Sequence, residues 1–238
     1  IAALGDDDAA IRDSARWIAG RHPEWSADLI AYFRTRLASP ASETEQEQLV
    51  DLLARLSKAA PLQEYLTNCV QHASHAEPAA RAALLAMAAT HQKELPLNWQ
   101  AALQGLLSSN SPLADDALAV IKSVPPAKSQ AASIAASLNQ VAESAASTQT
   151  RLAALALIPG GLQRVSPAQF KTLLAAIHRE QPSSLRTTAA DVLSKARLTP
   201  EQLIELSQQL PTAGLLEMDR LISAFALIAN DRVADEKA

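Results

Sequence analysis

An arginine recurs along this chain at a spacing of 35 residues, and each one opens an alanine-rich apolar stretch. Arg81, Arg151 and Arg186 share this register, because 151 to 186 is one period and 81 to 151 is two. Arg12 and Arg220 fit the same register to within one residue. A fixed period of this length is typical of stacked helical hairpins, not of a globule built around one central core.

Two positions of the register carry other residues, namely Gln46 and Asp116. Asp116 lies one residue before another alanine-rich stretch, so this segment keeps the pattern without its arginine. The 238 residues hold between six and seven units of this length. That number is enough for a continuous core if neighbouring units stack on one another.

The composition favours helices throughout. The chain contains 50 alanines and 35 leucines but only six glycines and few aromatic residues. Alanine and leucine are the strongest helix formers, and the runs of alternating β-branched and aromatic residues that strands require are missing from the sequence. We therefore predict an all-α fold: a right-handed superhelix of six to seven hairpins, of the HEAT or armadillo kind, forming a single domain over residues 1–238.

Apolar residues at helical spacing predict two helices in each unit. The first helix follows the run 6–8, carries Ile11, Ala15 and Ile18 on one face and stops at Gly20. The last helix covers about 215–228 and opens a seventh unit, and we expect the polar tail from Asn230 onward to be frayed. Other residues expected to carry the apolar faces include Leu84, Leu85, Ala88, Leu203, Ile204 and Leu206.

Prolines give independent support for this division into helices. A proline is tolerated at a helix start and costs about 3 kcal/mol inside a helix. Nine prolines fall between the periodic segments: Pro40, Pro61, Pro78, Pro96, Pro112, Pro126, Pro167, Pro182 and Pro200.

Charge and hydropathy exclude several classes of function. The net charge is -4 and basic residues are dispersed among acidic ones, so we expect no nucleic-acid partner. The most apolar stretch, 79–89, contains Arg81 and is far shorter than the roughly 20 residues of a membrane span. The single cysteine, Cys69, excludes an internal disulfide but leaves the compartment open. Because the chain begins at Ile1 without a signal-peptide pattern, we expect a piece of a longer polypeptide.

The opening of the first unit resembles a HEAT repeat, in which an acidic cap precedes an apolar-arginine pair and an alanine. The residues that carry this resemblance are Asp6, Ile11, Arg12 and Ala15, followed by Arg81, Arg151 and Arg186 with their alanines. In such repeats the aspartate and the arginine connect neighbouring units through a ladder of polar contacts. The positions equivalent to the aspartate are here His75, Ala145 and Glu180, so the resemblance implies an irregular ladder.

A narrower resemblance covers roughly residues 147–228 and is carried by the segments 182–193, 196–203 and 214–225. These segments resemble the helical region of large planctomycete-type proteins, which place it between a dehydrogenase-like β-propeller and a c-type cytochrome domain. The resemblance implies a location in the periplasm or cell envelope and a spacer role. The haem-binding Cys-x-x-Cys-His pattern does not occur in this sequence, since it has only one cysteine.

Few residues are candidates for chemistry. Cys69, His72 and His75, with His91 downstream, could be metal ligands by type, but steps of three on a helix spread the first three over about 120°. We therefore predict ordinary histidines and no metal or cofactor. The aspartates 6–8 lack the spacing of a calcium loop and are expected to cap the first helix.

Two further features have structural interpretations. Gly160 and Gly161 follow an expected helix and lack the lysine of a phosphate-binding loop, so we predict a helix end and turn. Trp17 and Trp25 flank the first turn between helices, where they either pack within the chain or mark a face for a preceding domain, while Trp99 is expected to lie on an apolar helix face.

These observations lead to a functional expectation. No nucleophile elbow or other local catalytic pattern occurs, so we predict a non-enzymatic scaffold or interdomain spacer that contacts a protein partner or neighbouring domains. The resemblance implies that the parent is a redox protein. Two alternatives remain open: a free-standing peptide-binding adaptor, and a HEAT-like DNA glycosylase, against which the acidic character argues.

Overall fold

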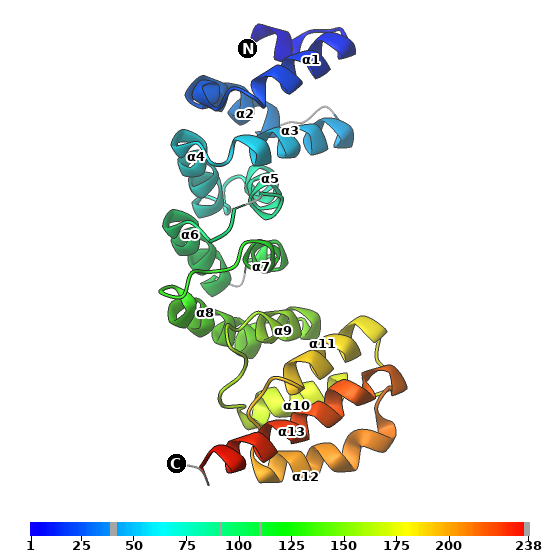
Figure 1. Ribbon diagram of the computed structural model, residues 1–238. Coiled ribbons are helices and arrows are strands. Elements are labelled where there is room, and N and C mark those ends of the chain that lie inside the picture. Colours follow the sequence, from blue (N-terminus) through cyan, green and yellow to red (C-terminus); the bar gives the residue numbers. More distant parts are fainter. Residues whose placement is uncertain (39–41, 91, 110, 236–238) are drawn as a thin grey trace. The chain divides into compact units, whose positions relative to one another are not determined.

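The fold is helical throughout the part of the chain that the structure describes. This computed structural model describes residues 1–38, 42–90, 92–109 and 111–235, the last of these as backbone alone from residue 227. These residues form thirteen α-helices and four short 3-10 helices, and their β pairing is limited to one isolated bridge between His178 and Ala213 (Figure 1). The prediction of an all-α fold is confirmed.

The chain divides into two compact units, Ile1–Gln130 and Ala131–Ala238. The prediction of one domain over residues 1–238 stays a prediction. The first unit contains η1 (Ala2–Gly5), α1 (Ala9–Ala19), η2 (Pro23–Trp25), α2 (Ser26–Ala38), α3 (Glu43–Leu56), α4 (Ala60–Gln71), α5 (Glu77–Ala88), α6 (Leu97–Ser108) and α7 (Ala114–Ser123).

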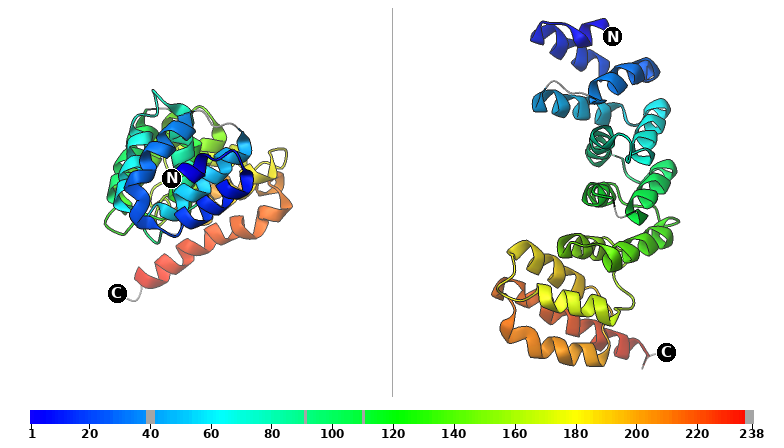
Figure 2. Two further views of the ribbon diagram at one scale, coloured as in Figure 1. Left: turned by 90° about the horizontal axis from the view of Figure 1, so that it is seen from above. Right: turned by 180° about the vertical axis from the view of Figure 1, so that it is seen from behind.

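From α2 onward, each helix of this unit packs against the helix that comes two places later in the chain. Helix α3 contacts α5, which contacts α7, while α2 contacts α4, which contacts α6. The helices therefore form two layers, and Figures 1 and 2 show these layers from opposite sides.

The pairing of consecutive helices differs from the expected hairpins. The consecutive pairs that pack on each other are α2–α3, α4–α5 and α6–α7. Each of these pairs joins the second helix of one expected hairpin to the first helix of the next. The helices were predicted at the right places, but periodicity along the chain does not say which neighbour a helix covers.

The second unit repeats this alternate packing. It contains α8 (Ala131–Ser144), α9 (Thr148–Ala156), α10 (Pro167–Ala176), α11 (Ser183–Leu193), α12 (Pro200–Gln209), η3 (Leu210–Thr212), η4 (Leu215–Glu217) and α13 (Met218–Asp235). Helices α9, α11 and α13 pack in one series and α8, α10 and α12 in the other. Helix α13 continues past Asn230, where the sequence predicted a frayed tail, and residues 236–238 lie outside the described part.

Local sequence explains where the helices begin. Ser166 and Thr199 form capping boxes with Gln169 and Gln202, and each cap is followed by a proline at the first helical position. Eight of the nine predicted breaks lie before a helix or within its first two residues, as expected, and Pro40 lies outside the described residues.

The core consists mainly of leucine and alanine, with Trp99 and Phe33 as its largest fully buried side chains. Four apolar residues that were expected to face the core are exposed: Ile11, Ile18, Leu85 and Ile204. On α5 the buried residues are four alanines, Leu84 and Met87, and Leu85 falls outside them. Helix α1 packs on η1, and its Ile11–Ile18 face remains open. Among the described helices, none has both the length and the apolar character that crossing a membrane requires.

Candidate functional site

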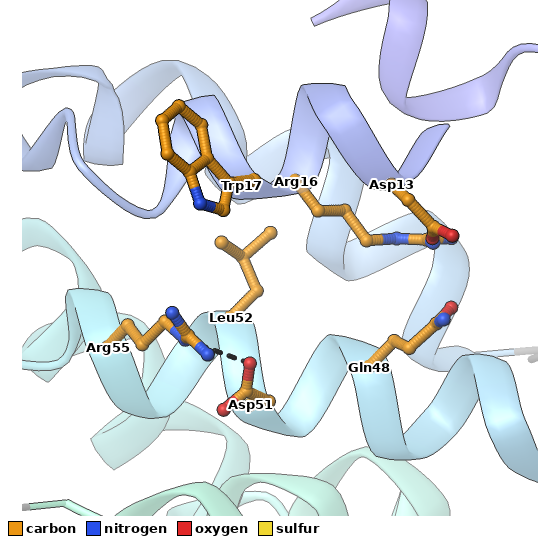
Figure 3. Close-up of a pocket in the computed structure, with 7 residues that line it drawn as sticks. All are labelled: Asp13, Arg16, Trp17, Gln48, Asp51, Leu52 and Arg55. Atoms are coloured by element: carbon orange, nitrogen blue, oxygen red, sulfur yellow. Dashed lines mark hydrogen bonds and ion pairs between the residues drawn. The ribbon is translucent and has the colours of Figure 1, made fainter. Parts of the chain in front are cut away.

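A cleft lies between α1 and α3 in the first unit and has a volume of about 190 Å³. Figure 3 shows side chains from both helices reaching into it. Its lining is Asp13, Arg16 and Trp17 from α1, and Gln48, Asp51, Leu52 and Arg55 from α3. The spacings of three and four residues within each set place these side chains on one face of their helix, so two ordinary helical faces form the cleft.

Two intrahelical ion pairs organise the polar walls. Arg16 Nη1 donates to Asp13 Oδ1 at 2.8 Å on α1, and Arg55 Nε donates to Asp51 Oδ2 at 2.9 Å on α3. The Arg16 side chain is only 11% exposed, and its Nε is buried without an acceptor among the described residues. Buried donors normally have a partner, so this unsatisfied N–H is unusual.

Two exposed tryptophans lie near the turn between α1 and α2, and one of them, Trp17, lines the cleft. Trp17 is 58% exposed and carries the guanidinium of Arg21 over its ring at 3.6 Å. Trp25 is 39% exposed and stacks on His22 at 4.2 Å between ring centroids. The hydrogen bond between His22 and Glu24 lowers the pKa of that carboxyl group. Trp99, by contrast, is fully buried, as its position on an apolar helix face predicted.

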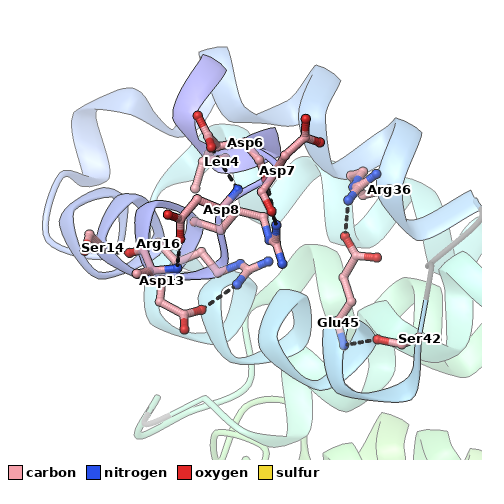
Figure 4. Close-up of polar contacts among 12 residues, drawn as sticks. Leu4, Asp6, Asp7, Asp8, Asp13, Ser14, Arg16, Arg36, Ser42 and Glu45 are labelled. Atoms are coloured by element: carbon pink, nitrogen blue, oxygen red, sulfur yellow. Dashed lines mark hydrogen bonds and ion pairs between the residues drawn. The ribbon is translucent and has the colours of Figure 1, made fainter.

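The aspartates at the start of α1 act as a helix cap, as predicted. Asp8 Oδ1 accepts from the amide of Ala10 at 2.8 Å, and Asp6 Oδ1 accepts from the amide of Asp8 at 2.9 Å (Figure 4). Arg12 Nη1 donates to the carbonyls of Asp6 and Asp7 at 2.7 and 2.8 Å. These contacts fix the turn that leads into α1.

The candidate metal ligands on α4 and after it do not converge. Cys69 is partly buried, and this burial raises the pKa of its thiol, while a hydrogen bond with Tyr65 lowers it. His72 Nδ1 contacts the carbonyl of Asn68 at 2.8 Å, and His75 Nδ1 contacts the hydroxyl of Ser74 at 2.9 Å. Within the described ranges no group of three His, Cys, Asp or Glu side chains is placed to hold a metal ion. His91 lies outside the described residues.

The two adjacent glycines form a turn after α9, as predicted. Both have positive φ, 79° at Gly160 and 73° at Gly161, which glycine adopts without strain. A Cβ on Gly161 would lie 2.8 Å from the carbonyl oxygen of Lys195, whereas one on Gly160 would meet nothing within 4 Å. Gly161 therefore allows the turn to approach the backbone at Lys195 closely.

The register arginines have two structural roles. Arg12 and Arg151 bind carbonyls in the turn before their own helix, Arg151 donating to Ala145 at 2.5 Å. Others reach a second element: Arg81 lies 3.9 Å from Asp116, and Arg220 donates to Asp191 at 2.9 Å. Asp116, which replaces an arginine in the register, is thus a partner of the arginine one period earlier. Arg81 and Arg220 therefore each connect two helices of one compact unit.

Arg186 combines both roles in a buried network. Its Nη1 donates to the carbonyl of Gln181 at 2.6 Å, and its Nε donates to Glu217 Oε2 at 3.2 Å. The Thr187 hydroxyl donates to the other carboxylate oxygen at 3.4 Å, and Glu217 is 1% exposed. Gly214 lies so close to this pair that a Cβ there would overlap the Glu217 carboxylate.

In the first unit Arg36 and Glu45 form a comparable ion pair at 2.5 Å, from the end of α2 to the start of α3 (Figure 4). Glu45 is buried, and its amide donates to the hydroxyl of Ser42. This pair is off the arginine register, so the register alone does not identify the buried ion pairs.

No family model, no curated protein and no solved structure matches this chain. Function must therefore be argued from the residues themselves. Sequence reasoning identified Trp17 but missed its companions in the cleft, Gln48 and Arg55 above all. The helical spacing of 48, 51, 52 and 55 was readable in the sequence, but the position of that face opposite α1 was not.

Proposed function

We propose that this chain is a non-enzymatic helical scaffold that binds a protein partner or a neighbouring protein domain. The observation that supports this proposal is the exposure of two of its three tryptophans, Trp17 near the end of α1 and Trp25 in η2, together with the partly exposed Ile11 and Ile18 of α1. Tryptophan is enriched at the centres of protein interfaces, and clustered exposed apolar side chains are typical of interaction sites.

The architecture we propose for this scaffold is a right-handed, HEAT-like solenoid. The alternate packing of helices within each unit supports it. Small-angle X-ray scattering tests the architecture, because a compact chain of this length has a radius of gyration of about 18 Å. A solenoid gives a clearly larger value, and a value near the compact one contradicts it.

Selection of peptides from a display library tests the binding function. The whole chain is immobilised and exposed to random 12-residue peptides, and we expect reproducible enrichment over the bare support. A selection that enriches no peptide contradicts the proposal. So does tight, salt-sensitive binding of duplex DNA at low salt, which would favour the DNA-binding alternative.

The resemblance of residues 147–228 supports a more specific role. We propose that the scaffold joins a dehydrogenase-like propeller to a c-type cytochrome domain in the cell envelope. The reading frame of the parent gene tests this role: it should encode a propeller on one side and a Cys-x-x-Cys-His segment on the other. A parent without these domains leaves only the general scaffold function.

A further inference from the structure

Helix α1 turns its polar side towards α3 and its apolar side away from it. Asp13, Arg16 and Trp17 line the cleft that faces α3 (Figure 3). Because successive residues of an α-helix are about 100° apart, Ile11 and Ile18 lie on the opposite side of α1. They are 44% and 42% exposed. An amphipathic helix normally turns its apolar side to the rest of the protein, so this orientation leaves an apolar surface that a further element can cover.

Exposed large apolar side chains are concentrated in this part of the first unit. Among the described residues, five of the eleven lie within residues 1–25, where η1 and α1 contact each other. These five are Ile1, Ile11, Trp17, Ile18 and Trp25. Clustered exposed apolar side chains are typical of interaction sites, so the Ile11–Ile18 face belongs to a surface with the character of an interface.

The order of residues along α1 indicates what covers this face. Ile11 and Ile18 lie at equal distances from the midpoint between Ser14 and Ala15. Two copies of α1 that run antiparallel about a twofold axis at this midpoint place Ile11 of each copy opposite Ile18 of the other. The two residues at the centre are small, which allows the helices to approach closely.

The charges at the two ends of α1 match in the same arrangement. Asp7 and Asp8 precede the helix, Arg21 follows it, and all three residues are exposed. Antiparallel packing brings the aspartates of each copy level with Arg21 of the other, whereas parallel packing would bring like charges together. Complementary charge sets the orientation of an interface, so the face and its flanks fit a second copy of this chain.

We propose that the protein forms a reversible homodimer in which the Ile11–Ile18 faces of two α1 helices pack antiparallel about a twofold axis. A stable interface of standard size engages about 20–30 residues on each side. Helix α1 has 11 residues, so the dimer is weak and dissociates on dilution. Self-association does not depend on the proposed binding of other proteins, because a chain that selects no peptide can still dimerise through α1.

Sedimentation equilibrium of the whole chain gives the first test. The average mass should rise from that of the monomer at low micromolar concentration towards twice that value near millimolar concentration. It should not rise further, because a twofold interface uses the same surface on both copies and closes. A mass that stays at the monomer value, or one that passes the dimer value, overturns the proposal.

A matched pair of substitutions locates the interface. Ile18 on α1 and Leu85 on α5 are both 42% exposed. Each dimer contains Ile18 twice, so Ile18→Ser should raise the dissociation constant at least tenfold, while Leu85→Ser should leave it within twofold. Circular dichroism verifies that both variants are folded. Equal dissociation constants for the two variants place the interface elsewhere and overturn the proposal.

An exchange of charges tests the antiparallel direction. Asp7 is chosen because Asp8 caps α1. Asp7→Arg and Arg21→Glu each bring like charges together twice in the dimer, so each should raise the dissociation constant at least threefold at low salt. The double variant restores opposite charges and should return to within twofold of the wild type. Arg21 also covers the Trp17 ring, but the double variant lacks this contact too, so its recovery reports on the charges alone. A double variant that dimerises no better than the single variants overturns the antiparallel arrangement.

Discussion

Arg81 and Arg186 occupy equivalent positions three periods apart, but their surroundings differ sharply. The Arg81 side chain is 44% exposed, pairs with Glu77 on its own helix and reaches Asp116 only at 3.9 Å. The Arg186 side chain is 15% exposed and contacts Glu217, which is 1% exposed. One sequence register therefore produces a surface ion pair in the first unit and a buried one in the second.

The difference shows that burial, rather than position in the repeat, decides how much an arginine contributes to stability. Exposed ion pairs are screened by water and contribute about 0–1 kcal/mol. A buried pair adds little relative to apolar residues, but removing one partner leaves a charge without compensation and costs about 3–5 kcal/mol. We expect Arg81 to be replaceable and Arg186 to be required for the stability of its unit.

The largest expected effect follows replacement of the two arginines by methionine. Arg186→Met leaves the Glu217 carboxylate buried without its cation and should lower the free energy of unfolding of the second unit by about 3 kcal/mol. Arg81→Met should change that of the first unit by less than about 1 kcal/mol. Both are measured by urea denaturation.

Two probes separate the units in this experiment. All three tryptophans lie in the first unit, so their fluorescence reports on that unit, while far-UV circular dichroism reports on both. Arg186→Met should shift the dichroism transition by more than the fluorescence transition. Equal losses from the two variants would show that the burial of Glu217 does not determine the difference.

Glycine-to-alanine substitutions sharpen the comparison with a smaller effect. At Gly214 a Cβ would overlap the Glu217 carboxylate and lie 2.6 Å from Arg186 Nε. Gly214→Ala should separate the pair and destabilise the second unit by about 1–3 kcal/mol, the usual cost of overpacking. Gly105 lies in α6 with nothing within 4 Å of an added Cβ, so Gly105→Ala should stabilise the first unit by about 0.5–1 kcal/mol. Two thermal shifts of the same sign would contradict this interpretation.

The sequence predicted the helices well because their signals are local. Proline positions depend on the immediate backbone, and the structure places Pro167 and Pro200 at the first position of their helices, after the caps Ser166 and Thr199. Burial depends on neighbours that sequence does not place. Ile11 and Ile18 have helical spacing but are 44% and 42% exposed, and Leu85 lies outside the buried face of α5, which its neighbours Leu84, Met87 and several alanines form.

The candidate site was less predictable for the same reason. Arg16 and Arg55 are 39 positions apart in the sequence, and only the packing of α1 near α3 brings them to one cleft. Glu217 follows two exposed leucines and resembles an ordinary helix-start residue. Nothing near it in the sequence indicates that its partner is Arg186.

The smallest expected effect is the pH dependence that the ion pair between Arg81 and Asp116 gives to the stability of the first unit. Burial raises the pKa of Asp116 above its ordinary value of 3.8, while Arg81 acts in the opposite direction. The Asp116 carboxyl group therefore stays protonated to a higher pH in the folded state than in the unfolded chain. The stability that this group contributes is complete below the ordinary pKa and is lost as pH rises through the folded pKa.

Asp116→Asn removes this titration. The stability of the variant relative to the wild type should therefore rise as pH increases from about 4 through the folded pKa and then become constant. Tryptophan fluorescence during urea denaturation at several pH values measures this difference in the first unit. A difference that is constant with pH, or that falls over this range, would mean that attraction to Arg81 outweighs the burial of Asp116. The surface pair would then resemble the buried pair of Arg186 more closely than their exposures indicate.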